Sequence, residues 1–188
     1  MTSDTAASAI RVAWITFGLF WLASARRLKK TERAESPTSL AIRTVGSLAA
    51  VLFAFVPWGG LANPLVPRTQ MLLVVSVVLA WAGVLFAIWA RVILGRNWSA
   101  TVTLKQSHDL IQSGPYRWVR HPIYSGMLLS FIGVILFLDR VGGVVGLVIA
   151  IAVYYLKARQ EETIMAGHFG QAWEQYRSRT RAIIPFIL

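Results

Sequence analysis

The residues best suited to chemistry lie in one polar stretch, residues 114–124, directly before an apolar segment. This stretch contains two prolines, two arginines, one histidine and two tyrosines. Charged and polar groups are costly to place beside a membrane, and the chain is otherwise largely apolar, so such a stretch indicates a functional role. We expect it to form half of a small-molecule site.

A second polar feature, the adjacent pair Glu161 and Glu162, follows the last apolar segment. Glutamates at the end of a membrane-spanning helix are usually paired or functional. They could form surface salt bridges with Lys157 or Arg159, which lie four and two residues before Glu161 along the same helix. They could instead recognise a cation or an amine. The sequence leaves both interpretations open.

Metal and hydrolase chemistry find little support. The three histidines, His108, His121 and His168, lack a metal-ligand spacing such as His-x-x-x-His, so we predict no metal site. The chain has no cysteine, which excludes disulfides, thiolate metal sites and a cysteine nucleophile. Although Asp109 follows His108 directly, no serine sits in a nucleophile-elbow context, so a Ser-His-Asp hydrolase is not predicted.

The elements that must position these residues are helices in a membrane. Of the 188 residues, 56% are hydrophobic and only 14% are charged, whereas about a quarter of the residues in a soluble domain are charged. Several apolar runs approach or exceed the roughly 18 residues that indicate a membrane span. We expect an all-α, polytopic membrane protein that forms a single domain over residues 1–188.

Five spanning helices are predicted, at residues 10–25, 40–58, 71–94, 123–138 and 141–156. The first three occupy residues 1–94, and a polar loop follows the third. Each of the last two has only 16 residues, about 24 Å of helix, which is shorter than the roughly 30 Å hydrocarbon core. We therefore expect them to form a short helical hairpin, with Gly142, Gly143 and Gly146 permitting close approach at its far end.

The basic residues predict the orientation of these helices. The net charge is +11, and of the 19 lysines and arginines only Arg11, Arg68 and Arg140 fall on one side of the predicted topology. The positive-inside rule then places the N-terminus outside and the C-terminus in the cytoplasm. We expect the cell (inner) membrane, attraction to anionic lipid headgroups and no nucleic-acid partner.

The C-terminal region has the pattern of an amphipathic helix. Met165, Phe169, Trp173 and Tyr176 recur at spacings of four, four and three residues, which places them on one helical face. We expect this helix to lie on the cytoplasmic membrane surface.

A hairpin of the last two spans also brings distant polar residues together. Its two ends carry His121 and Tyr124 on one side, and Lys157, Arg159 and the Glu161–Glu162 pair on the other. The sequence therefore predicts that the stretch at residues 114–124 and the glutamate pair face each other across one pocket.

Several motifs in the second half of the chain occur in a characteristic order. They are His108-x-Leu-Ile, Gly114-Pro-Tyr-Arg, Arg120-His-Pro-x-Tyr124, Glu161-Glu162, Phe169-Gly-x-x-Trp-x-x-Tyr176 and Ile184-Pro185. Together they resemble the isoprenylcysteine carboxyl methyltransferase family and, more broadly, the group that includes phospholipid N-methyltransferases. The resemblance covers residues 95–188, and the earlier helices match only in general character.

The resemblance implies an integral membrane enzyme that uses S-adenosylmethionine without a Rossmann domain, and no strand–Gly-x-Gly–helix signature is present here. Residues 95–188 would then comprise a cofactor-binding loop, the hairpin and the C-terminal helix. Glu161 would meet the ammonium or ribose of the cofactor. By analogy, the cofactor pocket comprises His108, Asp109, Leu110, Ile111, Tyr116, His121, Pro122, Ile123, Tyr124, Glu161 and Glu162.

One departure from the family concerns the methyl acceptor. Family members usually carry an arginine four residues before the first glutamate, where it contacts the acceptor, but this chain has Lys157 there. Lysine offers a point charge rather than a planar fork that matches a carboxylate. Arg159 or Arg120 could take over this contact, so these three residues are the catalytic candidates.

The implied function is methyl transfer to a lipophilic acceptor or lipidated substrate at the cytoplasmic membrane face. A carboxylate acceptor, as on a prenylated cysteine, needs mainly positioning. A lipid amine or hydroxyl would need deprotonation, for which His121 or His108 are the candidates. Two other functions remain open: an NADPH-dependent membrane reductase of the sterol type, and a non-catalytic membrane scaffold.

Overall fold

The computed structural model describes residues 1–25, 31–33, 36–98, 104–105 and 109–183. The α-helices within these ranges are α1 (Ser3–Ser24), α2 (Pro37–Phe55), α3 (Gln70–Leu94), α4 (Pro122–Leu138), α5 (Val141–Phe169) and α6 (Gln171–Arg179). Short 3-10 helices are η1 (Gly59–Ala62), η2 (Gly95–Asn97) and η3 (Gly114–Arg117). Two very short strands, β1 (Thr31–Arg33) and β2 (Leu104–Lys105), pair antiparallel. The all-α prediction is thus confirmed apart from this small strand pair.

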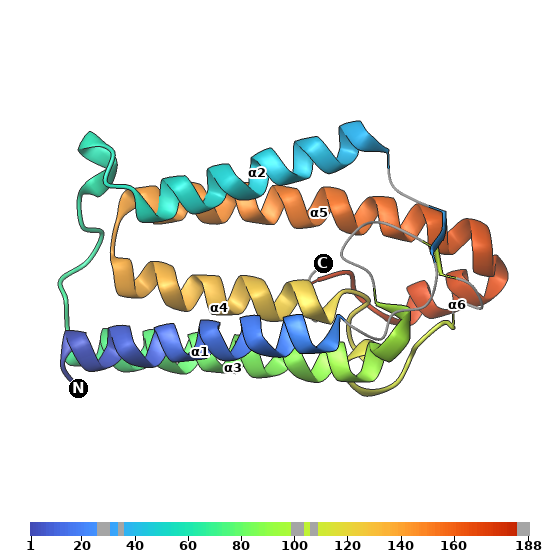
Figure 1. Ribbon diagram of the computed structural model, residues 1–188, viewed down its shortest axis with the longest axis horizontal. Coiled ribbons are helices and arrows are strands. Elements are labelled where there is room, and N and C mark those ends of the chain that lie inside the picture. Colours follow the sequence, from blue (N-terminus) through green and yellow to red (C-terminus); the bar gives the residue numbers. More distant parts are fainter. Residues whose placement is uncertain (26–30, 34–35, 99–103, 106–108, 184–188) are drawn as a thin grey trace.

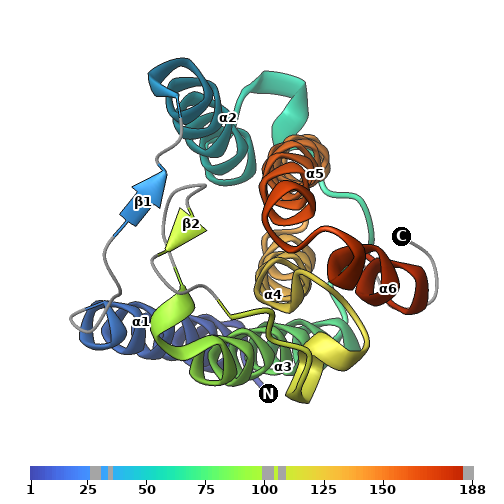
Figure 2. The same cartoon turned by 90° about the vertical axis from the view of Figure 1, so that its right-hand side faces the viewer.

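The long helices form an elongated bundle (Figure 1). Helix α3 packs on α1 and α4, α2 packs on α5, and α4 joins the two groups by packing on α5. One end of the bundle carries the N-terminus, η1 and the α4–α5 turn, and the other end carries α6 and the strand pair, as the end-on view in Figure 2 also shows. The polar residues of the predicted site lie at this second end.

Side chains at the helix starts explain where three of the helices begin. The hydroxyls of Thr2, Ser36 and Thr69 accept hydrogen bonds from backbone N–H groups in the first turns of α1, α2 and α3, at 3.1–3.2 Å. Such caps satisfy N–H groups that have no partner within the helix. Pro122 lies in the first turn of α4, where its missing N–H costs nothing.

Glycines allow the tightest helix contact, between α3 and α4. A methyl group on Gly126 would lie 2.6 Å from the carbonyl oxygen of Gly83, and one on Gly133 would lie 2.6 Å from Ser76 O. The two backbones therefore touch, and this contact fixes the position of α4 and of the residues just before it.

The glycines at the start of α5 serve two contacts rather than one. Gly143 faces Ile135 of α4, as expected for a hairpin, but Gly142 and Gly146 lie against the backbone of α2, at Phe53 O and Ala50 O. The prediction that these glycines bring α4 and α5 together is therefore right for Gly143 only, because α5 packs mainly along α2.

Four helices are long and apolar enough to span a membrane: α1, α2, α3 extended to Asn97, and α5. Helix α4 is apolar but has only 17 residues, so five spans are not confirmed. The expected short hairpin also changes, because α5 runs for 29 residues instead of ending near residue 156. No proline interrupts it, and Gly170, with φ of 52°, ends it.

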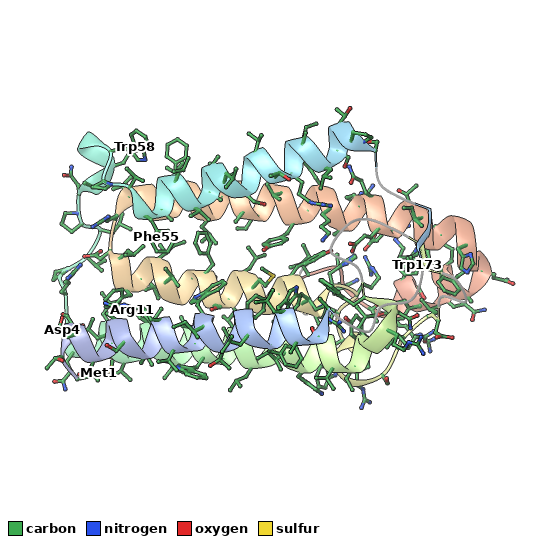
Figure 3. All side chains as sticks on the ribbon, in the orientation of Figure 1. Met1, Asp4, Arg11, Phe55, Trp58 and Trp173 are labelled. Carbon is green, nitrogen blue, oxygen red and sulfur yellow. The ribbon has the colours of Figure 1, made fainter. Side chains whose placement is uncertain are left out.

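The predicted C-terminal amphipathic helix is divided between two elements. Met165 and Phe169 belong to α5, whereas Trp173 and Tyr176 belong to α6. Trp173 and Tyr176 are only 4% and 3% exposed, so they pack inside the protein and do not lie on a membrane surface. Figure 3 labels Trp173 at the site end of the bundle. The break at Gly170, with φ of 52°, explains the difference, because a helical pattern in sequence does not reveal a break between two helices.

Candidate functional site

A partly open cavity of about 130 Å³ lies at the α6 end of the bundle. Its walls come from the end of α3 and η2, from residues 109–124, and from α5 and α6. The lining residues are Leu94, Asn97, Trp98, Asp109, Leu110, Ile111, Tyr116, Arg120, His121, Ile123, Tyr124, Glu161, Met165, Trp173 and Tyr176. The two predicted polar segments therefore meet at one cavity, as the hairpin argument required.

His121 bridges the two glutamates. Its Nδ1 lies 3.3 Å from Glu161 Oε2, and its Nε2 lies 3.3 Å from Glu162 Oε1. His121 is 9% exposed and directly precedes Pro122, the first residue of α4. The tight packing of α4 on α3 therefore holds the backbone of His121 in place. As an imidazolium, His121 donates from both ring nitrogens, one to each carboxylate.

The electrostatics of the cluster favour this charged form. Burial by itself lowers the pKa of His121, but hydrogen bonds to Glu161 and Glu162, together with their negative charges, outweigh burial and raise the pKa above its ordinary value. By contrast, burial and the neighbouring Tyr176 and Glu161 raise the pKa of the Tyr116 phenol far above neutral pH. The cavity thus presents ion-paired groups beside a neutral phenol.

Arg120 completes the cluster on the Glu162 side. Its Nε donates to Glu162 Oε1 at 2.7 Å, the same oxygen that faces His121. Its Nη1 donates to the carbonyl oxygens of Thr180 at 2.6 Å and Arg177 at 3.3 Å. Arg120 therefore joins α5 to the end of α6.

Tyr124 and Lys157 complete the cluster on the Glu161 side. The Tyr124 hydroxyl donates to Glu161 Oε1 at 2.6 Å, and Lys157 Nζ lies 3.9 Å from the same oxygen. The Lys157 ammonium also lies 5.2 Å from the centre of the Tyr124 ring, a cation–π distance. The rings of His121 and Tyr154 stack on Tyr124 with centroid distances of 5.3 and 5.1 Å. This stack holds the Tyr124 ring in a defined orientation.

Most of the predicted cofactor residues gather here. Asp109, Leu110, Ile111, Tyr116, His121, Ile123, Tyr124 and Glu161 line the cavity. Glu162 is buried directly behind His121, and Pro122 is buried at the start of α4. His108 lies outside the described residues, as do Ile184 and Pro185.

The three catalytic candidates lie in different surroundings. Arg120 lines the cavity, and Lys157 contacts Glu161 and Tyr124 beside it. Arg159 is exposed and is not among the described lining residues. Two residues along a helix correspond to roughly 200° of rotation, so Arg159 projects away from the face that carries Lys157 and Glu161.

Sequence reasoning missed six lining residues: Leu94, Asn97, Trp98, Met165, Trp173 and Tyr176. The amphipathic pattern did single out the last three, but it suggested a membrane-facing stripe. Trp98 is buried and lies 4.6 Å from the Arg91 guanidinium, which a single sequence does not reveal. These residues supply much of the apolar and aromatic surface of the cavity.

Comparison with known proteins assigns this arrangement to a family. The model of the isoprenylcysteine carboxyl methyltransferase (ICMT) family matches residues 71–167, from the start of α3 almost to the end of α5. The chain belongs to this family. The matched region contains the His121–Glu161–Glu162 cluster, so the family assignment and the site geometry concern the same residues.

The relatives agree with this assignment. A probable protein-S-isoprenylcysteine O-methyltransferase of Oryza sativa subsp. indica is 30% identical over 101 residues, 52% of this chain and 53% of that protein. The Mus musculus protein-S-isoprenylcysteine O-methyltransferase is 32% identical over 98 residues, 50% of this chain and 34% of that protein. The chain thus spans about half the length of the rice protein and a third of that of the mouse protein.

Two further similarities cover more of the chain. The cobalt-zinc-cadmium resistance protein CzcN of Cupriavidus metallidurans is 30% identical over 141 residues, 73% of this chain and 58% of that protein. The solved structure of the eukaryotic intramembrane Ras methyltransferase ICMT superposes with a TM-score of 0.57 at 21% identity, over 81% of this chain and 54% of that one. The similarity to the solved structure shows that the bundle has the ICMT membrane fold.

Proposed function

We propose that the chain is a membrane methyltransferase that uses S-adenosylmethionine and methylates the carboxylate of a lipophilic acceptor resembling a prenylated cysteine. The observation that carries this proposal is the cluster in which His121 bridges Glu161 and Glu162 at the wall of a cavity. Family membership favours methyl transfer over the reductase and scaffold alternatives.

The cavity is lined by side chains of the chemical types that can bind S-adenosylmethionine. The carboxylates of Asp109 and Glu161 can accept hydrogen bonds from an ammonium or from ribose hydroxyls, and the rings of Trp98 and Tyr116 offer surfaces for a purine. At about 130 Å³ the cavity is smaller than the roughly 300 Å³ at which ligand pockets begin. Binding would therefore extend through its open side or widen it. The bound sulfonium would supply an activated methyl group.

The cluster favours an acceptor that is already an anion. With both ring nitrogens facing carboxylates, His121 is poorly placed to remove a proton from an amine or a hydroxyl. A carboxylate needs no deprotonation, so positioning suffices. We assign the acceptor side to Lys157, which lies one turn before Glu161 on the same helix.

We further propose that the site end faces the cytoplasm of the cell (inner) membrane, with the N-terminus outside. Arg177 and Arg179 belong to α6, at the end that carries the site, whereas Arg140 lies in the α4–α5 turn at the other end (Figure 1). A water-soluble cofactor would then arrive from the cytosol, and a lipophilic acceptor would arrive from the bilayer. All of residues 1–188 would serve as one unit.

Replacing Glu161 tests the cofactor assignment. Glu161→Gln keeps the size of the side chain but removes its charge, and hydrogen bonds to charged groups contribute about 1.5–3 kcal/mol. We expect the affinity for S-adenosylhomocysteine, measured by calorimetry in detergent, to fall roughly 10- to 100-fold. Glu174→Gln, an exposed change on α6, is the matched control and should bind like the wild type. Equal affinities for both variants would contradict the assignment.

A labelling experiment tests the acceptor. Membrane lipid extract is incubated with the protein and radiolabelled S-adenosylmethionine, and the product is treated with mild base. A methyl ester releases labelled methanol, whereas a methylated amine or ether keeps its label. Release would support a carboxylate acceptor, and a base-stable product would overturn that part of the proposal.

A further inference from the structure

Arg120 connects three separate parts of the chain. It lies just before α4, its Nε donates to Glu162 on α5, and its Nη1 donates to the carbonyl oxygens of Arg177 and Thr180 at the end of α6. Its side chain is 9% exposed. A buried cation at the last carbonyl groups of a helix also interacts favourably with the helix dipole. Arg120 therefore stabilises the end of α6 and the carboxylate of Glu162 at once.

Helix α6 forms a wall of the cavity, and hydrogen bonds to distant parts of the chain hold it there. It contributes Trp173 and Tyr176 to the lining, and it is separated from α5 by the helix break at Gly170. The Tyr176 hydroxyl donates to Tyr116 O at 2.7 Å. Arg179 Nη2 donates to Gln112 Oε1 at 3.0 Å, and the short chain segment after α6 provides further hydrogen bonds.

That segment, residues 180–183, pairs with residues 118–121 through the backbone. Arg120 N donates to Arg181 O at 2.8 Å, His121 N donates to Ala182 O at 2.9 Å, and Arg181 N donates to Trp118 O at 3.2 Å. The Ser125 hydroxyl donates to Ile183 O. The residue that precedes His121 and the chain that follows α6 are thus held together directly beside the cavity.

We propose that Arg120 is a positioning residue, which holds the α6 wall against the cavity and fixes the Glu162 carboxylate that faces His121. Its role is to keep the cofactor side of the site assembled, and it does not bind the methyl acceptor. The expected effect of Arg120 on kinetics rests on the proposed function. Its expected effect on the position of α6 does not depend on that function.

The donor geometry supports this role over acceptor binding. The Nε and Nη1 groups of Arg120 already face a carboxylate and two carbonyl oxygens. Recognition of an acceptor carboxylate by a planar fork requires two adjacent N–H groups. Turning the guanidinium toward an acceptor would break the contacts with Glu162 and Thr180, and would therefore release α6.

The structural test is hydrogen–deuterium exchange of the full chain in lipid nanodiscs. In Arg120→Ala we expect amides in the peptide covering residues 171–183 to exchange at least about tenfold faster, because local opening loses charge-assisted hydrogen bonds. Arg120→Lys keeps a charge without the fork and should fall in between. Arg177→Ala is the matched control, since it removes an exposed cation but keeps the carbonyl group that Arg120 contacts.

Peptides from the α3–α4 contact serve as the internal reference for global unfolding. Faster exchange confined to residues 171–183 in Arg120→Ala supports the proposal. Unchanged exchange there overturns it, whether or not the protein binds any cofactor. Wild-type protein that fails to bind S-adenosylhomocysteine would instead refute the proposed function and leave this structural result standing.

The kinetic test separates positioning from acceptor binding. We expect Arg120→Ala to raise the KM for S-adenosylmethionine at least about tenfold and to leave the KM for the acceptor unchanged, because the wall and the carboxylate that it fixes belong to the cofactor side. Arg120→Lys should restore part of this loss. A rise in the KM for the acceptor, with the KM for the cofactor unchanged, would show that Arg120 binds the acceptor and would overturn the proposal.

Discussion

Glu162 offers the sharpest test of how the cluster is held together. Its Oε1 accepts hydrogen bonds from Arg120 Nε at 2.7 Å and from His121 Nε2 at 3.3 Å, and the residue is 8% exposed. The change Glu162→Gln keeps the size of the side chain, but it removes the charge and can place an N–H₂ group against two donors. Two buried cations then lose their shared partner.

The expected loss of stability follows from these two bonds. Each hydrogen bond to a charged group contributes about 1.5–3 kcal/mol, and breaking a buried ion pair by removing one partner costs about 3–5 kcal/mol. We expect a loss of about 3–5 kcal/mol, which lowers the melting temperature of a chain of this size by roughly 6–20 °C. Differential scanning calorimetry at neutral pH, in one detergent throughout, measures this change.

The control for this measurement is Glu174→Gln. Glu174 lies on α6, its side chain is 60% exposed, and its ion pair with Arg177 spans 3.9 Å. Exposed pairs contribute about 0–1 kcal/mol, so the melting temperature should move by no more than about 4 °C. If Glu162→Gln melts within this range of the control, the view that Glu162 holds two buried cations is refuted.

Two further predictions concern pH and helix packing. The pKa of His121 is raised in the folded state, so its stabilising contribution is present in full below its unfolded pKa of about 6.5 and is lost as pH rises through the folded pKa. The melting temperature of the wild type should therefore fall as pH rises from the unfolded to the folded pKa. If the melting temperature of His121→Gln falls equally steeply with pH, this prediction is wrong. Gly126→Ala would place a methyl group 2.6 Å from Gly83 O, so calorimetry should show a loss of about 1–3 kcal/mol. Gly18→Ala, which meets nothing within 4 Å, should instead gain about 0.5–1 kcal/mol; equal effects of the two changes would show that α3 and α4 do not pack this closely.

The class of protein and the two halves of the site could be predicted from sequence. Apolar runs with few charges indicate membrane helices, because the hydrocarbon core of the bilayer excludes charged groups however the helices pack against one another. The polar stretch before Tyr124 and the glutamate pair stood out for the same reason. That they face each other followed from connecting two consecutive helices by the turn at Asp139 and Arg140.

The structure decided which of these polar groups pair with one another. His121 faces both glutamates, Arg120 contacts Glu162 and α6, and Arg159 projects outward. These arrangements depend on how each helix is rotated about its axis and on where α5 ends.

Periodicity in a sequence reports which residues share a helical face, but it does not report what that face meets. Trp173 and Tyr176 illustrate this, because the same stripe suits a membrane surface or a cavity wall. Only contacts between residues some forty to sixty positions apart distinguish these cases, and such contacts form when the whole bundle packs.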